Sequence, residues 1–236
     1  EFYSYISEVF LCISEVDHTI SHLKGWMKEK VVDTPLMCGP GKSSIVSEPL
    51  GTILVMGAWN YPLYTTIGPL SQVIAAGNCA VIKMAEISPH CSNAIYNLCN
   101  KYLDPSFYKP VEGKIKTAIK LTSMRFDMIV FTGSTVKGKL VAEAAAKNLV
   151  PCVMELGGKS PCFIDESADI ALATKKIIFG KMPNFGQVCI APDYILCHES
   201  KLEEFVRIFK DTIRERYGDL KTTDASGKMI NEFHYN

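Results

Sequence analysis

Short apolar runs alternate with longer amphipathic segments along most of the chain. The runs cover residues 52–57, 79–84, about 107–111, 128–133 and 151–156, and glycine, proline or polar turn residues flank them. The segments between them carry apolar residues at the three- and four-residue spacing of helices. Apolar strands that alternate with helices are typical of a parallel sheet with helices on its faces. The pattern therefore predicts an α/β fold.

The helices of the first half are predicted from apolar stripes and from the residues that begin and end them. Residues 2–27 carry the stripe of one amphipathic helix. Pro62 lies near the start of the next helix, which Gly77 ends, and Ser88 with Pro89 should form the N-cap and first turn of the one after. The stripe of the first helix comprises residues 6, 9, 10, 13, 16, 20 and 23.

The second half of the chain continues this alternation. An alanine-rich helix follows Gly133, another helix spans about 168–180, and a strand-like run at 194–197 precedes a last helix. That last helix should begin with a capping box from Ser200 to Glu203, and Gly218 lies just past its end. The apolar residues that share one of its faces are Leu202, Phe205, Val206, Phe209 and Ile213.

Several candidate functional residues lie at or just past the ends of predicted strands. They are Asn60, Lys83, Gly133 and Glu155. In open parallel sheets, ligands bind beyond the carboxyl ends of the strands. The sequence therefore predicts a ligand site at this edge of the sheet.

The segment FTGSTVKG (131–138) passes from a strand through a glycine turn into a helix. The N–H groups and the positive dipole end of such a helix start can hold a pyrophosphate. Its spacing, G-x-x-x-x-G, differs from the usual dinucleotide pattern, so an ordinary capped turn is the alternative. Lys83 could likewise meet a ribose or phosphate, with a solvated strand-end lysine as the alternative.

Two further side chains could take part in acid–base or oxyanion chemistry. Glu155 ends a strand before two glycines, so we expect a partly desolvated carboxylate that can act as a base. A strand-end glutamate in water is the alternative. The amide of Asn60 has two donors that could stabilise an oxyanion, although asparagine is also an ordinary turn residue.

Cys189 lies in the loop NFGQVCIAP (184–192), directly after an apolar helical stretch. Most of the nine cysteines are expected to be inert thiols, but a cysteine on a polar, glycine-containing loop could be a nucleophile. No cysteine belongs to a C-x-x-C pair and no histidine has zinc-motif spacing, so no metal site is expected. The odd number of scattered cysteines favours a reducing, cytoplasmic location.

The charge balance and the length of the apolar runs limit the partners. Lys+Arg and Asp+Glu both number 25, so the formal net charge is zero. A nucleic-acid partner is not expected, because binding to phosphates requires a basic surface. No apolar run approaches the roughly 20 residues that span a bilayer, so no membrane segment is expected in this chain.

Five motifs occur together in the order and spacing of the aldehyde dehydrogenase superfamily, which the chain resembles from about Glu1 to Asn236. They are AWNYP (58–62), VIKMAE (81–86), FTGSTVKGK (131–139), ELGGKSP (155–161) and GQVCIAPDY (186–194). The WNYP and GQ-x-C-x-APDY segments resemble the class 3 branch, which includes the fatty aldehyde dehydrogenases.

The resemblance implies a role for each candidate residue in oxidising an aldehyde to a carboxylic acid with NAD or NADP. Cys189 would be the nucleophile that forms a thiohemiacetal and then a thioester. Asn60 and the Cys189 backbone N–H would hold the oxyanion, and Glu155 would activate the hydrolytic water. Lys83 and Glu86 would contact the adenosine ribose. The residues beside the pyrophosphate would be Gly133, Ser134, Thr135, Val136, Lys137 and Gly138.

The resemblance also implies the domains and the partners. Residues 1–156 would form the NAD(P)-binding domain, with a Rossmann-like parallel sheet and the N-terminal helix. Residues 157–236 would form the first part of an α/β catalytic domain. The substrate would be a medium- or long-chain aliphatic or an aromatic aldehyde, and the full-length parent would be a homodimer.

Departures from the family pattern leave a second interpretation open. Met84 and Ala85 stand where the family usually has proline and serine, and the family's C-terminal half has no counterpart in these 236 residues. That half includes the glutamate that holds the nicotinamide ribose. The alternative is therefore a truncated, non-catalytic remnant that binds a nucleotide or a partner without turnover. We expect this chain alone to show no aldehyde oxidation.

Overall fold

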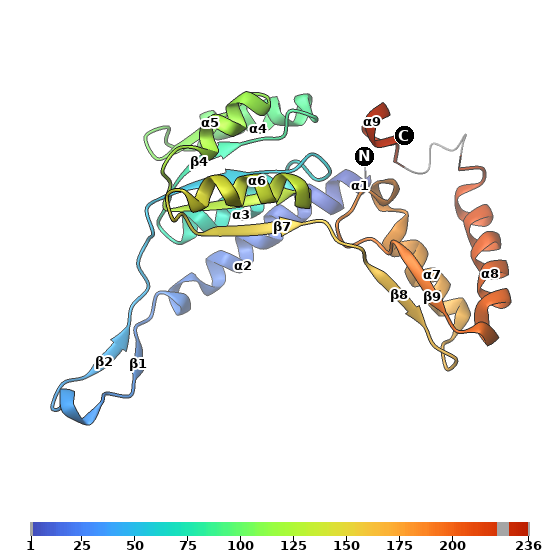
Figure 1. Ribbon diagram of the computed structural model, residues 1–236, viewed down its shortest axis with the longest axis horizontal. Coiled ribbons are helices and arrows are strands. Elements are labelled where there is room, and N and C mark those ends of the chain that lie inside the picture. Colours follow the sequence, from blue (N-terminus) through green and yellow to red (C-terminus); the bar gives the residue numbers. More distant parts are fainter. Residues whose placement is uncertain (1, 221–226, 236) are drawn as a thin grey trace. The chain divides into compact units, whose positions relative to one another are not determined.

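In the computed structural model, which describes residues 2–220 and 227–235, the five predicted strands form one sheet (Figure 1). The strand order is β5-β4-β3-β6-β7, and β3 runs parallel to β4 and β6, as β4 does to β5. The α/β fold with a parallel sheet is therefore confirmed. The strands are β3 (Thr52–Met56), β4 (Cys79–Lys83), β5 (Tyr108–Val111), β6 (Met128–Gly133) and β7 (Cys152–Leu156).

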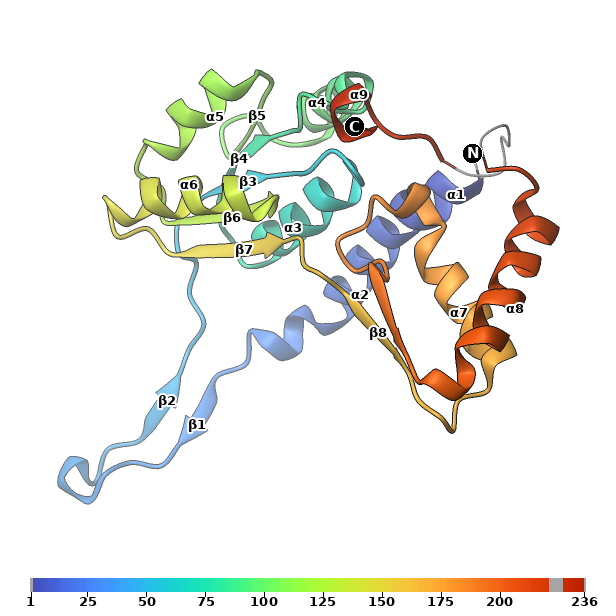
Figure 2. The ribbon, with the colours of Figure 1, turned by 45° about the vertical axis from the view of Figure 1, so that its right-hand side comes forward.

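Helices pack against this sheet, and each of them lies between two consecutive strands in the sequence, as predicted (Figure 2). The elements are α3 (Tyr64–Ala75), α4 (Pro89–Tyr102), α5 (Ile115–Thr122) and α6 (Thr135–Ala146). Side chains of α3 and α4 share one core cluster with Ile53 and Val55 of β3. Alternate residues of a strand point to opposite faces, so the fully buried Leu54 lies on the other face. The core of this unit thus extends over both faces of β3.

The chain divides into two compact units, Glu1–Glu155 and Leu156–Asn236. The sequence placed the boundary between residues 156 and 157, one residue further on. In the second unit, β8 (Pro161–Ile164) and β9 (Tyr194–Cys197) pair in parallel, and helices α7 (Ile170–Lys181) and α8 (Glu199–Tyr217) share a small apolar core with them. The 3-10 helix η3 (Pro183–Gly186) and α9 (Glu232–Tyr235) complete the described elements of this unit.

The N-terminal segment is helical as predicted, but its apolar stripe is not buried. Ile6, Phe10 and Ile13 are 43%, 51% and 49% exposed. Polar bonds instead attach this helix to α3, because the amide of Gln72 donates to Glu15 (2.8 Å) and to Thr19 (2.7 Å). The segment comprises α1 (Phe2–Ser4), the π-helix η1 (Tyr5–Phe10) and α2 (Leu11–Trp26).

Glu8, within the π-helical turn η1, holds the N-terminus of α3. Its Oε2 accepts the backbone N–H of Leu63 at 2.7 Å and of Tyr64 at 3.3 Å. Burial raises the pKa of Glu8, although the two backbone hydrogen bonds oppose that change. A carboxylate at this position also interacts favourably with the positive end of the helix dipole.

Replacing Glu8 with glutamine is expected to alter stability in a pH-dependent way. The pKa of Glu8 in the folded protein lies above the ordinary value of 4.5, so folding favours its protonated form. The wild-type protein therefore loses stability as the pH rises from the ordinary pKa through the raised one. Glutamine does not titrate and keeps an oxygen acceptor. The urea midpoint of Glu8→Gln minus that of the wild type should therefore become more positive as the pH is raised from about 4 to about 7.

The same substitution at the exposed Glu29 measures the general effect of removing one carboxylate. A Glu8→Gln midpoint that falls relative to wild type over this pH range would contradict the prediction. It would mean that the charge at the helix N-terminus stabilises more than its burial costs.

A hairpin that the sequence did not predict extends away from the sheet of the first unit (Figure 1). Its strands, β1 (Lys30–Val32) and β2 (Ser43–Ile45), are antiparallel, and a short 3-10 helix, η2 (Leu36–Cys38), lies between them. Leu36 and Met37 are 97% and 99% exposed. Strands of three residues without buried side chains have no apolar pattern, so nothing in the sequence indicated them.

One predicted helix cap is wrong, and a second, Ser88 with Pro89, has the predicted position but no side-chain cap hydrogen bond. Helix α8 begins one residue before Ser200, and the ring of His198 accepts the Ser200 N–H at 3.4 Å. Ser88 does precede α4, but its hydroxyl donates to the Trp59 carbonyl at 2.9 Å and makes no cap hydrogen bond. The sequence shows which residues are able to cap a helix, but not which competing partner is nearby.

Candidate active site

Three of the predicted site segments follow neighbouring strands of the first unit. β4, β3 and β6 are adjacent and parallel, so their carboxyl ends lie at one edge of the sheet. Asn60 lies in the turn after β3, Lys83 ends β4, and Gly133 ends β6. The fold therefore brings these three segments to the same edge, as expected from the sequence.

The turn that carries Asn60 is held by hydrogen bonds on both sides of this residue. The hydroxyl of Thr65, in the first turn of α3, donates to the Tyr61 carbonyl at 2.8 Å. The hydroxyl of Ser88 donates to the Trp59 carbonyl at 2.9 Å. Asn60 itself is half-buried. These two supporting residues were not predictable from the sequence, because the bond from Ser88 spans 29 positions and no local motif indicates it.

Lys83 is buried and pairs with the exposed Glu86, so the alternative of a solvated lysine is wrong. Only 3% of Lys83 is exposed, and its Nζ donates to Glu86 Oε2 at 2.8 Å and to the Met84 carbonyl at 2.7 Å. Partial burial opposes ionisation of Glu86, but the hydrogen bond and charge of Lys83, with the charge of Lys137, hold its pKa below the ordinary value. The turn after β4 and the first turn of α6 therefore interact electrostatically.

The turn from β6 into α6 has the geometry of a capped helix start. The Ser134 hydroxyl accepts the Lys137 N–H at 3.4 Å, and the Gly138 N–H donates to the Ser134 carbonyl at 2.8 Å. A Cβ on Gly133 would lie 2.6 Å from the Phe131 ring, so any larger residue at this position would require that ring to move. Val136 and Lys137 are exposed, and Gly138 is buried.

The Glu155 carboxylate is exposed, so the expected partial desolvation is wrong for the described chain. Glu155 lies on β7, which is an edge strand of the sheet and has no buried residue. A Cβ added to Gly157 or Gly158 would meet no described atom within 4 Å, so the described residues do not fill the space that these glycines leave. Strand-end sequence alone did not reveal that this strand lies at the edge.

Cys189 is exposed on a loop of the second unit, between η3 and β9. The residues that follow it hold the end of the loop that leads into β9: Ala191 is buried, and the Asp193 N–H donates to the Ser160 carbonyl at 3.0 Å. The carboxylate of Asp193 also pairs with Lys159 at 2.9 Å. The loop is therefore attached to the segment that precedes β8 while its thiol remains exposed.

The other cysteines differ in accessibility. Cys12 and Cys99 are buried, and burial, followed by the charges of Glu8 and Glu15, raises the pKa of Cys12 to about 11. Cys162 and Cys197 are half-buried within the paired strands β8 and β9. Cys38 and Cys91 are exposed, as Cys189 is. Exposure alone therefore does not single out Cys189.

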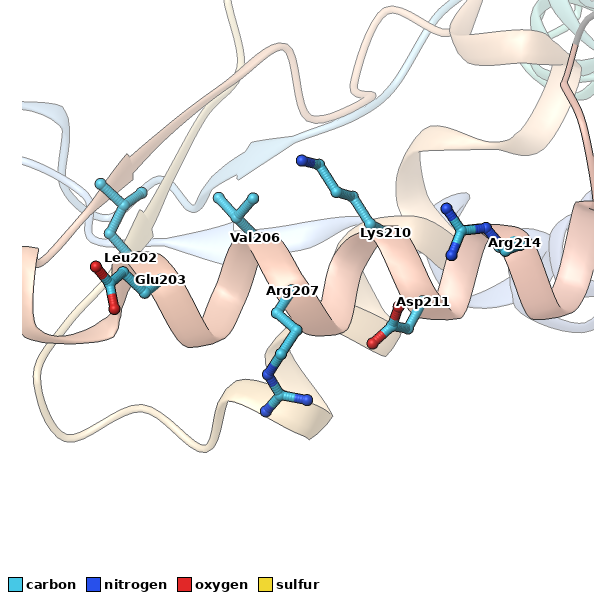
Figure 3. Close-up of a pocket in the computed structure, with 7 residues that line it drawn as sticks. All are labelled: Leu202, Glu203, Val206, Arg207, Lys210, Asp211 and Arg214. Atoms are coloured by element: carbon cyan, nitrogen blue, oxygen red, sulfur yellow. The ribbon is translucent and has the colours of Figure 1, made fainter.

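A surface cavity of about 510 Å³ lies on α8 (Figure 3). It is lined by Leu202, Glu203, Val206, Arg207, Lys210, Asp211 and Arg214. Leu202 and Val206, which were grouped with the apolar face of this helix, are 48% and 39% exposed, whereas Phe205 is buried. Every lining residue belongs to α8, so the cavity contains none of the candidate catalytic or cofactor-binding residues.

Residues 2–220 and 227–235 offer no candidate for a membrane-spanning helix or for a metal site. None of the helices formed by these residues has the length and apolar character needed to cross a bilayer. Their His, Cys, Asp and Glu side chains form no group of three or more that could hold a metal ion.

Comparison with known proteins identifies the family of the chain. Residues 4–236 match the sequence model of the aldehyde dehydrogenase family. The chain belongs to the aldehyde dehydrogenase family. The family resemblance predicted from the five motifs is thereby confirmed.

The chain is similar in sequence to several named aldehyde dehydrogenases. It is 42% identical to the mouse protein "Aldehyde dehydrogenase, dimeric NADP-preferring" over 236 residues, which are all of this chain and 52% of that protein. It is 41% identical to "Aldehyde dehydrogenase family 3 member A2" of Pongo abelii, covering all of this chain and 49% of that one. The chain thus spans about half the length of these relatives.

The fold also matches a solved structure of the family. The structure described as the substrate-bound state of Staphylococcus aureus AldH superposes with a TM-score of 0.94 at 40% sequence identity. The match covers 99% of this chain and 51% of that one. The two units described above therefore have the fold of aldehyde dehydrogenases.

Proposed function

We propose that this chain carries the nucleophile, the base and the adenosine-binding edge of an NAD- or NADP-dependent aldehyde dehydrogenase. The reaction is the oxidation of an aldehyde to its carboxylic acid. The observation that supports it most directly is the grouping of the Asn60 turn, the Lys83–Glu86 pair and the start of α6 at one sheet edge, in a chain of this family.

The chemistry of this sheet edge fits an adenine dinucleotide. Lys83 and Glu86 offer a donor and an acceptor suited to ribose hydroxyls. The start of α6, from Gly133 to Gly138, offers backbone N–H groups and the positive end of a helix dipole, which suit a pyrophosphate. When bound, the dinucleotide supplies the hydride acceptor. The name of the mouse relative, "NADP-preferring", supports NADP as one of the two cofactors to test.

The remaining chemistry is assigned to side chains of this chain. The Cys189 thiolate forms a C–S bond with the aldehyde carbon, and the amide of Asn60 donates to the oxygen that gains negative charge. After oxidation the substrate is held as a thioester. Glu155 takes a proton from a water molecule, whose oxygen attacks the thioester carbon. The C–S bond breaks, the acid leaves and the Cys189 thiolate is restored.

The proposal extends to the substrate and to the assembly. We propose a medium- or long-chain aliphatic or an aromatic aldehyde as the substrate, on the resemblance to the class 3 branch. The word "dimeric" in the name of the mouse relative supports a homodimer, and the exposed Leu36 and Met37 of the β1–β2 hairpin offer apolar surface for it. Nine free thiols support a reducing, cytoplasmic location.

Aldehyde-dependent formation of NADH or NADPH tests the proposal. The protein is assayed by absorbance with each cofactor and with hexanal, hexadecanal and benzaldehyde. Turnover with at least one pair supports the reaction, and the ratio of kcat/KM values identifies the substrate class. Nucleotide binding by calorimetry without any turnover would instead favour the alternative of a protein that binds a nucleotide without catalysis.

A further inference from the structure

The side chain of Gln187 joins the cysteine loop to a segment about forty residues further along the chain. Its Nε2 donates to the Lys228 carbonyl at 3.0 Å, and its Oε1 accepts the Ile230 N–H at 3.0 Å. The same Nε2 also donates to the Asn184 carbonyl at 2.9 Å. One amide thus pairs with a donor and an acceptor of residues 228–230 and with the turn that precedes Cys189.

The turn that Gln187 holds has an unusual backbone. Asn184, Phe185 and Gly186 have successive φ values of 47°, 55° and 78°, all in the left-handed region. This region is disfavoured for a residue with a Cβ, above all for a bulky one such as Phe185, unless its surroundings fix it. Gly227 packs closely on this turn, since an added Cβ there would lie 3.2 Å from the Asn184 carbonyl carbon.

Cys189 depends on such contacts for its position. Residues 187–193, which include it, belong to no helix or strand. Gln187 lies only two residues before the thiol, and its hydrogen bonds connect that part of the loop to residues 184 and 228–230. Loss of these bonds would let the turn relax toward ordinary dihedral angles and would move the backbone that carries the sulfur.

We propose that Gln187 is a positioning residue for Cys189, acting through its paired hydrogen bonds to residues 228–230 and to the Asn184 carbonyl. The proposal rests on the catalytic role given to Cys189 above. It assigns to the segment Lys228–Ile230 a part in holding the cysteine loop, although this segment lies far from the loop in sequence.

The test compares Gln187→Met and Gln187→Glu with Gln72→Met in the catalytically active protein that contains these residues. Methionine keeps the length of the glutamine side chain but makes none of its hydrogen bonds. Glutamate has an oxygen where glutamine has its NH₂ group, so it cannot donate to the Asn184 and Lys228 carbonyls. Gln72 is the only other glutamine of the chain and also makes two side-chain hydrogen bonds, to Glu15 and Thr19. It is therefore the matched control.

The first readout is the pre-steady-state burst of reduced cofactor. Both Gln187 variants should lower the burst rate constant by about 10- to 100-fold with the burst amplitude retained, because a displacement of ~1 Å costs about that much. Gln72→Met should keep the wild-type burst rate. A burst rate within twofold of wild type in Gln187→Met, or a loss of amplitude at an unchanged rate, would overturn the positioning role.

The second readout does not depend on turnover, so it separates this proposal from the proposed function. Hydrogen exchange of the Ile230 amide should be faster in Gln187→Met by about 10-fold, which corresponds to the net contribution of one hydrogen bond. Gln72→Met should not change it. Accelerated exchange in Gln187→Met, together with a wild-type protein that oxidises no aldehyde, would confirm the link and refute the proposed function. Unchanged exchange would overturn the link itself.

Discussion

Replacing Cys189 with serine should lower kcat in the active protein by a factor on the order of 10⁴ or more, because removal of a covalent nucleophile removes the reaction path itself. Serine keeps the size of the side chain, but its hydroxyl is far less acidic than a thiol. The thiohemiacetal and thioester therefore do not form. Steady-state assays with a saturating aldehyde, together with mass spectrometry of an acyl adduct trapped at Cys189, measure the effect.

Cys38→Ser is the matched control, since Cys38 is also exposed and lies on the hairpin of the other unit. Substoichiometric iodoacetamide provides a second measurement, because loss of activity should follow labelling of Cys189 and not of Cys38 or Cys91. Cys91 should react slowly, as burial and the charge of Glu8 raise the pKa of its thiol. Activity that survives in Cys189→Ser above a few percent would refute the nucleophile.

Replacing Glu155 with glutamine should abolish turnover but spare the first step. Glu155 is proposed to act only on the water that hydrolyses the thioester, so the pre-steady-state burst should persist with its amplitude. Steady-state turnover should fall on the order of 10²- to 10⁴-fold, the usual contribution of a general base. Rapid-mixing absorbance at a single turnover and at many turnovers separates the two steps.

Glu143→Gln on α6 provides the control, because Glu143 is another exposed carboxylate of the first unit. This variant should keep both the burst and the turnover. If Glu155→Gln lost the burst as well, the carboxylate would act before or during hydride transfer, or would be required for folding. Equal unfolding midpoints of the two variants would exclude the folding explanation.

The sheet was predictable from the sequence because burial on both faces leaves a continuous apolar signal. Residues 53–56 of β3 are all buried, and such a run can be recognised without knowledge of its neighbours. β8 and the β1–β2 hairpin lack that signal, since they are short and largely exposed. The N-terminal helix does carry an apolar stripe, but the residues of that stripe are largely exposed. Hydrogen bonds from Gln72 of α3 to Glu15 and Thr19 hold this helix instead, and no periodicity marks these polar residues.

The site was predictable as a set of segments but not as a set of contacts. Parallel strands place their carboxyl ends together, so the grouping of Asn60, Lys83 and Gly133 followed from the fold class. The bond from Ser88 to the Trp59 carbonyl spans 29 positions, and the bonds of Gln187 depend on residues 228–230. Contacts between positions distant in sequence leave no mark in a single sequence.

The π-helical turn Tyr5–Phe10 affects which changes in chain length this protein can accept during evolution. A π turn contains one residue more than an α turn. Deleting one residue within this π turn would therefore restore ordinary α-helical geometry with little rotation of the parts on either side. Deleting one residue within α2 would instead rotate everything before the deletion by about 100° around the helix axis, and the carboxylate of Glu8 would leave the Leu63 and Tyr64 amides that it now contacts. Single-residue deletions among descendants should accordingly be found in the π turn rather than in α2.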